Sequence, residues 1–321
     1  MKPSKVVGYF FKGLLLIFIF YLPILLKNNY YIHMLNIAVV YIIAVYGLNF
    51  ITGMTGQMNL GSAGIFALGA YTTTLLSMKL NVSPWLAMIA VVFIGFLAGI
   101  GLGFPSLRLK GVYLSLTTIG FTEIVRLFTN NMTSLTNGAV GIRGIPPYNL
   151  FGVDLGRPPN FYYFIVVVCL LLTLLVHRII ASKWGRAFIA IKDNIDAVEV
   201  CGINVVKIKM TAFCLAAIFC AVSGALYAHC QKYISPLSFT SDLSITMVVM
   251  LMLGGRGKIS GCIVGAVVVT VLPELLRGLG DYYQIVFYTT ILILAIFLPG
   301  GLVNLFVQSK KNFVEKLVAK S

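Results

Sequence analysis

Charged side chains are scarce in this sequence of 321 residues, where they make up 10% of the chain while 59% of the residues are hydrophobic. Acidic residues are the rarest, with 9 Asp and Glu against 24 Lys and Arg. A soluble domain carries roughly 25% charged residues, so this chain lacks the polar groups to cover a water-exposed surface. Since a helix needs about 20 residues to cross the hydrocarbon core, the chain can hold at most roughly a dozen spans. The composition predicts a polytopic membrane protein without a large soluble catalytic domain.

Residues that carry catalysis or bind metals are also few. The 3 histidines lack metal-ligand spacing, and the 6 cysteines form no paired motif and are interpreted as small apolar side chains. Residues 254–260 superficially resemble a phosphate loop, but Ile259 stands where the motif requires Ser or Thr. G-x-S-x-G and H-E-x-x-H motifs do not occur. We expect no enzymatic reaction, no metal site and no cofactor in this chain.

Hydrophobic runs divide the chain into about ten candidate spans. They are residues 13–26, 30–51, 61–78, 84–104, 112–131, 161–181, 209–231, 240–254, 259–277 and 282–303. The first follows three lysines, as in a signal peptide, but it lacks a small-x-small cleavage site and is interpreted as a retained helix. The pattern predicts an all-α fold in one domain over residues 1–321, a polytopic transmembrane helix bundle in which some segments are short or broken.

The excess of basic residues gives the predicted topology. With the N-terminus in the cytoplasm, 17 of the 24 Lys and Arg fall on the inner side and 7 on the outer side. Because Lys and Arg accumulate in cytoplasmic loops, both termini are predicted to be cytoplasmic. Residues 132–160 then form a turn-rich outer loop, residues 182–208 a long cytoplasmic loop, and residues 304–321 a basic cytoplasmic tail. The positive charge therefore reflects topology and indicates no nucleic-acid partner.

Small and polar residues inside the spans mark two kinds of feature. Glycines recur every fourth position, and this spacing favours close helix packing over direct lining of a substrate path. These glycines are Gly95, Gly99, Gly103, Gly257, Gly261 and Gly265. The glycine-rich stretch 52–62 predicts either a simple turn or a broken helix of the kind at which transporters bind substrate. The candidate residues for that path are Gly56, Gln57, Asn59 and Gly61.

Ionisable residues inside a span are costly and often functional. Glu123 and Arg126 lie three positions apart, which places them on one helix face. Their spacing favours a structural ion pair, and Glu123 remains a candidate for the translocation path. Glu274 and Arg277 repeat the spacing near the outer end of a later span.

The cytoplasmic loop contains the most specific local pattern. Residues 193–202 predict one short helix, with Asp193 as its N-cap, acidic residues in its first turns, and Gly202 as its stop. The basic residues Lys183, Arg186 and Lys192 surround it. Because so short a helix is marginal by itself in water, we expect it to dock, either on its own bundle or in the groove of a cytoplasmic partner.

Several segments, in order between about residues 40 and 300, together carry a family resemblance. They are residues 47–49, 52–61, 69–71, 111–113, 120–127, 137–138, 144–146, 184–186, 190–194, 254–257, 261 and 265–266. This set resembles the LivM-type permease subunit of ABC importers for branched-chain amino acids. The resemblance implies that residues 193–202 are the EAA-type coupling segment, with Asp196 and Ala197 in the Glu-Ala places, Val198 in place of the second Ala, and Gly202 as its glycine.

The resemblance also implies the partners and the location. They are a LivH-type second permease, two ATPase subunits that bind ATP and Mg, an extracytoplasmic amino-acid-binding protein, and the lipid bilayer of the bacterial inner membrane. The ATPases would move the coupling helix, with Asp193, Asp196, Ala197, Glu199 and Gly202 as its contact residues. Similar permeases serve urea, short amides or other amino acids, which leaves the cargo open. A stand-alone ion-coupled carrier or an integral-membrane enzyme is the alternative of another class, although Glu123 is the one carboxylate well inside a predicted span and has Arg126 beside it.

Overall fold

The computed structural model describes residues 18 and 20–304, apart from positions 27, 110, 151, 152 and 299. Most of the basic tail and much of the first predicted span, including residues 13–17, lie outside the described residues. Each of the other nine predicted spans corresponds to a helix.

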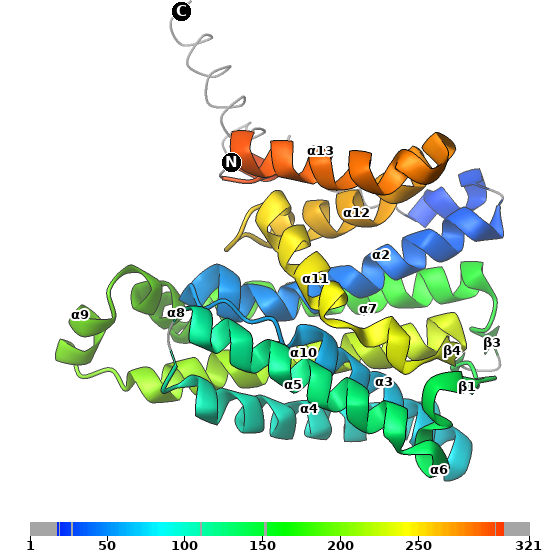
Figure 1. The fold of residues 1–321 in the computed structure, drawn as a ribbon, viewed down its shortest axis with the longest axis horizontal. Helices are drawn as coiled ribbons and strands as arrows, with labels where there is room; N and C mark the ends of the chain where they lie inside the picture. The colour runs from blue at the N-terminus through cyan, green and yellow to red at the C-terminus, as the bar shows by residue number, and fades with distance from the viewer. Residues whose placement is uncertain are drawn as a thin grey trace, which may run out of the picture.

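The long helices form the body of the protein (Figure 1). They are α2 (Asn29–Leu48), α3 (Ser62–Lys79), α4 (Pro84–Ser106), α5 (Val112–Asn131), α7 (Pro158–Ala181), α10 (Val205–Gln231), α11 (Ser241–Gly254), α12 (Ile259–Leu276) and α13 (Tyr283–Phe297). In the described part of the chain, five helices are long and apolar enough to cross a membrane: α2 with its extension, α4, α7, α10 and α12. The all-α membrane fold predicted from the sequence is confirmed.

Shorter elements connect these helices. They are the π-helical η1 (Asn49–Thr55), the helices α6 (Thr133–Thr136), α8 (Lys183–Asp193) and α9 (Ile195–Val200), the 3₁₀ turns η2 (Gly138–Val140), η3 (Pro236–Phe239) and η4 (Arg277–Tyr282), and the strands β1 (Ile142–Arg143), β2 (Asn149–Leu150), β3 (Val153–Asp154) and β4 (Tyr233–Ile234). Strand β1 pairs antiparallel with β4, and β2 with β3. The expectation of short and broken segments is met by η1 and by α11. At 14 residues, α11 is about 21 Å long against a hydrocarbon core of about 30 Å.

Helix α10 occupies the centre, where it packs against α2, α3 and α4. Its buried face is rich in small residues, and the crossing with α3 depends on two glycines. A Cβ on Gly224 would collide with the carbonyl of Phe66, and one on Gly69 with the carbonyl of Ala221. These two backbones therefore touch directly, which side chains larger than hydrogen would prevent.

The loops gather at two opposite ends of the bundle. Helices α8 and α9 project at one end, and α6 with β1, β3 and β4 lies at the other (Figure 1). At the second end, the Trp85 indole donates to the Asn149 carbonyl at 2.9 Å, and Lys79 Nζ donates to the Ser134 carbonyl at 2.6 Å. Lys232 Nζ likewise donates to the Gly156 carbonyl at 2.8 Å. The α8/α9 end thus collects the loops that the charge count assigns to the cytoplasm, and the other end collects the predicted outer loops.

Candidate functional site

A break in the chain between α2 and α3 forms the first part of the candidate site. The helix continues past Leu48 as the π-helical η1, ends at Gly56 with φ +74°, and runs as irregular chain to Gly61. The Asn59 side chain is buried and accepts a hydrogen bond from the Gly61 N–H at 2.8 Å. The helix therefore breaks at residues 56–61, and the role of residues 52–62 in binding substrate stays a prediction.

Helix α5 satisfies the backbone of this irregular segment. The Thr118 hydroxyl accepts from the Leu60 N–H at 3.0 Å, and the Thr122 hydroxyl donates to the Leu60 carbonyl at 3.3 Å. Irregular backbone at membrane depth persists only where protein groups or water supply such hydrogen bonds. In contrast, Oε1 of Gln57 is buried without a hydrogen-bond partner among the described residues.

Helices α8 and α9 form the second part of the site and correct one prediction. The sequence predicts a single helix over 193–202 with Asp193 as its N-cap, whereas Asp193 is the last residue of α8. The N-cap of α9 is Asn194, whose side-chain oxygen accepts from the Ala197 N–H at 3.0 Å. Asn194 has extended backbone angles, which separates the two helices. Asn and Asp cap helices about equally well, so sequence alone placed the boundary one residue too early.

The end of α9 follows the predicted pattern. Gly202 has φ +75°, the left-handed conformation that ends many helices. Val198 is buried and anchors α9, whereas Asp196, Ala197 and Glu199 are exposed. Val200 is 89% exposed and Cys201 is also exposed. Helix α9 therefore presents a mixed apolar and acidic surface at the tip of the bundle (Figure 1).

Helix α8 is amphipathic and connects α9 to the broken helix. Its buried residues Gly185, Phe188 and Ile191 recur every third position, which places them on one face. The Phe188 ring meets the Phe50 ring of η1 edge-on with centroids 6.2 Å apart, and Phe50 meets Phe219 of α10 at 5.7 Å. All three rings are buried.

A polar contact accompanies this aromatic chain. Lys192 Nζ donates to the Gly53 carbonyl at 3.2 Å, and the Lys192 side chain also lies against Gly56. A displacement of α8 would therefore act directly on η1 through the Lys192 hydrogen bond and the Phe188–Phe50 contact.

The other two predicted loop cations behave differently from Lys192. Lys183 and Arg186 are exposed, and the Arg186 guanidinium donates at 3.3 Å to the carbonyl of Ala181, the last residue of α7. Lys183 Nζ lies 6.0 Å from the centroid of the adjacent Trp184 ring. Neither of these contacts reaches η1, whereas Lys192 contacts the broken helix directly.

The turn after α11 closes the site on its other side. The Asn49 side chain, fully buried in η1, accepts from the Gly257 N–H at 2.8 Å. Gly257 lies in a turn with φ +82°, before α12 begins at Ile259. The prediction that Gly257 belongs to a helical row with Gly261 and Gly265 is therefore wrong, because the left-handed turn interrupts the helix.

The remaining predicted glycines lie at helix crossings. Gly95, Gly99 and Gly103 face α10, and a Cβ on Gly99 would lie 2.7 Å from the Cα of Cys214. Gly261 and Gly265 lie where α12 packs against α11. A Cβ on Gly261 would collide with the carbonyl of Gly255, and one on Gly265 would collide with the carbonyl of Met250.

A third polar group lies on α5 beside the start of α11. The Arg126 Nε and the Glu123 carboxylate form an ion pair at 2.7 Å, and the Ser241 hydroxyl donates to the other Glu123 oxygen at 2.7 Å. The Glu123 and Arg126 side chains are 35% and 26% exposed, beside apolar neighbours on α5 that are largely exposed. The predicted pairing is confirmed, and its environment is a half-exposed polar patch on an apolar face. Glu274 and Arg277 also pair, at 3.5 Å, near the opposite end of the bundle from α9.

Sequence reasoning missed several residues of this site. Asn49, Thr118, Phe188 and Ser241 hold its parts together. Asn49 could have been found as a polar residue in an otherwise apolar run, since such groups are costly in lipid. The other three have no local signal, because their roles depend on tertiary contacts.

The fold and this site define a polytopic α-helical membrane protein whose projecting end helix contacts a broken helix. Residues 30–297 match the family described as the permease component of the branched-chain amino acid transport system, and the chain belongs to that family. It is 32% identical over 290 residues to the high-affinity branched-chain amino acid permease protein LivM of Salmonella typhimurium, covering 83% of this chain and 68% of the relative. LivM of Escherichia coli K12 gives the same identity and coverage.

A further relative is LivH of Salmonella typhimurium, a permease protein of the same kind of transport system. It is 23% identical over 290 residues, covering 82% of this chain and 91% of the relative. No solved structure matches the chain significantly. The chain is thus a multi-pass membrane permease component, as the sequence resemblance predicted.

Proposed function

We propose that this chain and a second, LivH-like permease together form the path by which an ATP-driven importer moves leucine, isoleucine and valine across a bacterial inner membrane. Two partner ATPase subunits bind ATP and Mg, and an extracytoplasmic binding protein delivers the substrate to the end that carries residues 132–160. Both termini and α9 face the cytoplasm. The names of the LivM and LivH relatives support the substrate and the second permease. The basic residues gathered near α8 support the orientation.

The contact between α8 and η1 carries this proposal. A transport subunit driven by another chain needs an exposed element for that chain and a rigid connection from this element to the substrate path. Helix α9 offers exposed side chains at the tip, and Lys192 and Phe188 connect the adjacent α8 to η1. Because packed helices and aromatic side chains transmit displacement with little compression, closure of the ATPases shifts η1 together with α8.

The displacement of η1 reaches α5 through residues 57–61. Thr118 and Thr122 hold Leu60, so a shift of this segment alters the position of α5 and of the Glu123–Arg126 pair beside it. We propose that Gly56, Gln57, Asn59 and Gly61 form the moving segment. The half-exposed patch on α5 faces the second permease, and a zwitterion with an aliphatic side chain suits its paired charges and apolar surroundings.

The same geometry argues against an ion-coupled carrier. Such carriers use carboxylates in the membrane as ion or proton sites. Glu123 is already bound by Arg126 and Ser241, which leaves it poorly suited to take up a proton. The chain acts as a transport subunit and catalyses no reaction of its own, and the power for transport comes from the ATPases.

Uptake by the reconstituted complex tests the proposal. Proteoliposomes that contain both permeases, the ATPases and the binding protein should accumulate radiolabelled leucine when ATP is present inside. Excess isoleucine or valine should compete, whereas urea and short amides should not. Leucine uptake that persists without this subunit, or without ATP, contradicts the proposal. Competition by urea, without competition by isoleucine or valine, would show that the transported substrate is of another class.

Two substitutions, one in α9 and one in the turn that follows it, test the coupling role. Gly202→Asp places a side chain at a left-handed position and adds a charge, and Glu199→Arg reverses an exposed charge. Both should lower ATP-dependent uptake at least about tenfold, because each alters the surface offered to the ATPase. Unchanged uptake and unchanged complex assembly in both variants would show that α9 is not the coupling helix.

A further inference from the structure

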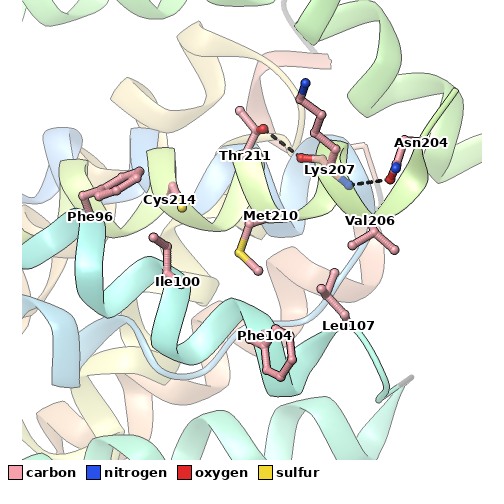
Figure 2. Close-up of a pocket in the computed structure, with 10 residues that line it drawn as sticks. All are labelled: Phe96, Ile100, Phe104, Leu107, Asn204, Val206, Lys207, Met210, Thr211 and Cys214. Atoms are coloured by element: carbon pink, nitrogen blue, oxygen red, sulfur yellow. Dashed lines mark hydrogen bonds between the residues drawn. The ribbon is translucent and has the colours of Figure 1, made fainter.

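A groove between α4 and α10 lies on the lateral surface of the bundle, away from the site described above. Its volume is about 420 Å³. Phe96, Ile100 and Phe104 of α4 and the adjoining Leu107 line one side, and Val206, Met210 and Cys214 of α10 line the other (Figure 2). Phe104 is 60% exposed and Val206 56% exposed, so the groove opens sideways. Since both helices are long and apolar enough to span the membrane, the groove opens toward lipid.

The groove is elongated along α4. Phe96 and Leu107 mark its ends on that helix, and eleven residues of α-helix rise about 16 Å. Met210 and Cys214 form the floor, and Gly103 lets α4 approach Met210 closely. The side chains between these two ends are apolar, so the groove suits a hydrocarbon chain.

Positive charge is confined to one end of the groove. Lys207 lies at the end formed by Asn204 and Val206, with its ammonium pointing away from Phe104 and Leu107 (Figure 2). The Arg108 guanidinium lies 5.9 Å from the centroid of the Phe104 ring, which is part of the lining. Both side chains are exposed, and the ion pairs among the described residues include neither of them.

This end of the groove also coincides with one end of the bundle. Arg108 follows α4 and Lys207 lies in the first turn of α10, so both lie where the spans end. Asn204 caps α10 by accepting from the Lys207 N–H at 2.9 Å. Cations at the end of a span attract anionic headgroups by about 1 kcal/mol each, and the positive end of the helix dipole adds to this attraction.

We propose that this groove binds one anionic phospholipid, with an acyl chain between α4 and α10 and its phosphate at the end of the groove that carries Arg108 and Lys207. The charge of the two cations complements a phosphate, and the apolar channel below them complements the attached chain. A site of this kind would make the stability of the permease depend on the anionic lipid content of the membrane. The inference does not depend on the transported substrate.

Native mass spectrometry of the purified, assembled transporter tests the site. Phosphatidylglycerol and phosphatidylcholine are added separately, and the lipid retained by each variant is measured. Arg108→Gln with Lys207→Gln should weaken phosphatidylglycerol binding about thirtyfold and leave phosphatidylcholine binding nearly unchanged. Met210→Trp fills the groove and should abolish retention of both lipids at this site.

A matched control lies on α7. Arg178 is an exposed cation in the last turn of α7, at the same end of the bundle but outside the groove lining. Arg178→Gln should leave phosphatidylglycerol retention at the wild-type value. An equal loss of phosphatidylglycerol retention in Arg178→Gln and in the double variant would show that the lipid responds only to nonspecific surface charge. That result would contradict the proposed site.

Three further outcomes would also contradict the proposal. Displacement of the lipid by inorganic phosphate alone would show that the apolar groove contributes nothing. Crosslinking of a Val206→Cys variant to the second permease in the assembled transporter would show that the groove is a protein interface. Retention of phosphatidylglycerol by the double variant at the wild-type value would exclude the two cations as its ligands.

Discussion

Helices α7 and α10 are both apolar enough to cross a membrane, but they lie in very different environments. The most apolar window of α10 is 61% buried inside the protein, whereas that of α7 is 17% buried although α7 is the more hydrophobic of the two. Helix α10 contacts α2, α3 and α4 through small residues. Helix α7 exposes Val167, Leu171, Leu174 and Leu175.

The difference follows from the solvent. Lipid is as apolar as a leucine side chain, so hydrophobicity gives a membrane helix no reason to be buried. Close packing gives that reason, and it requires small residues where backbones cross. In this protein the distribution of glycine and alanine therefore indicates the core better than hydropathy does.

The strongest test of this contrast is a bulky residue at the centre of α10. Gly224→Leu should destabilise the protein by at least about 3 kcal/mol, because its side chain would collide with the backbone at Phe66. Thermal unfolding in detergent can be followed with a thiol-reactive dye, since Cys214, Cys220 and Cys262 are buried. Val167→Leu on exposed α7 is the matched control and should shift the midpoint little; equal shifts would remove the contrast.

The same contrast exists within a single helix, α4. Gly99 faces the backbone of α10, while a Cβ on Gly101 would meet nothing within 4 Å. Gly99→Leu should cost about 1–3 kcal/mol and Gly101→Leu less than about 0.5 kcal/mol, as measured by the same thermal assay. A larger effect at Gly101 would mean that this face of α4 packs against a partner in the tested preparation.

The α8 end offers a contrast between two cations. Lys192 donates to the Gly53 carbonyl of η1, whereas Arg186 donates to the carbonyl of Ala181 at the end of α7. A hydrogen bond from a charged group contributes about 1.5–3 kcal/mol, so Lys192→Met should reduce leucine uptake at least about tenfold while ATP hydrolysis continues. Arg186→Met should change uptake less than about twofold. Coupled loss of both activities in Lys192→Met would indicate failed assembly instead of lost transmission.

The smallest effect on transport is expected at Glu123, whose side chain is neither fully buried nor fully exposed. Glu123→Gln keeps the size of the side chain but removes the charge that pairs with Arg126. Because the pair is partly exposed, its loss should cost less than about 1 kcal/mol of binding free energy. We therefore expect the KM for leucine to rise about threefold, with little change in kcat. Dependence of wild-type uptake on a proton or sodium gradient would instead favour an ion-coupled carrier.

The sequence predicted the fold class, the helices and the family because each depends on hydropathy or on motifs that are local in the chain. It also predicted the Glu123–Arg126 pair, since residues three apart share a helix face. The boundary at Asn194 was missed because Asp193 and Asn194 are both suitable caps. The contacts of Asn49 with Gly257, and of Lys192 with Gly53, join residues more than 100 positions apart, which no local pattern specifies.

Cysteine crosslinking at Cys201 tests most directly whether α9 meets the ATPase. Cys201 is exposed at the end of α9, while the other five cysteines are buried or half-buried. In the assembled transporter, a thiol crosslinker should join Cys201 to an ATPase subunit, and ATP should change the yield. Removal by Cys201→Ser should abolish the product. A Cys201 thiol that stays fully open to reagents in the intact complex, with no crosslink to the ATPase, would contradict the proposed coupling.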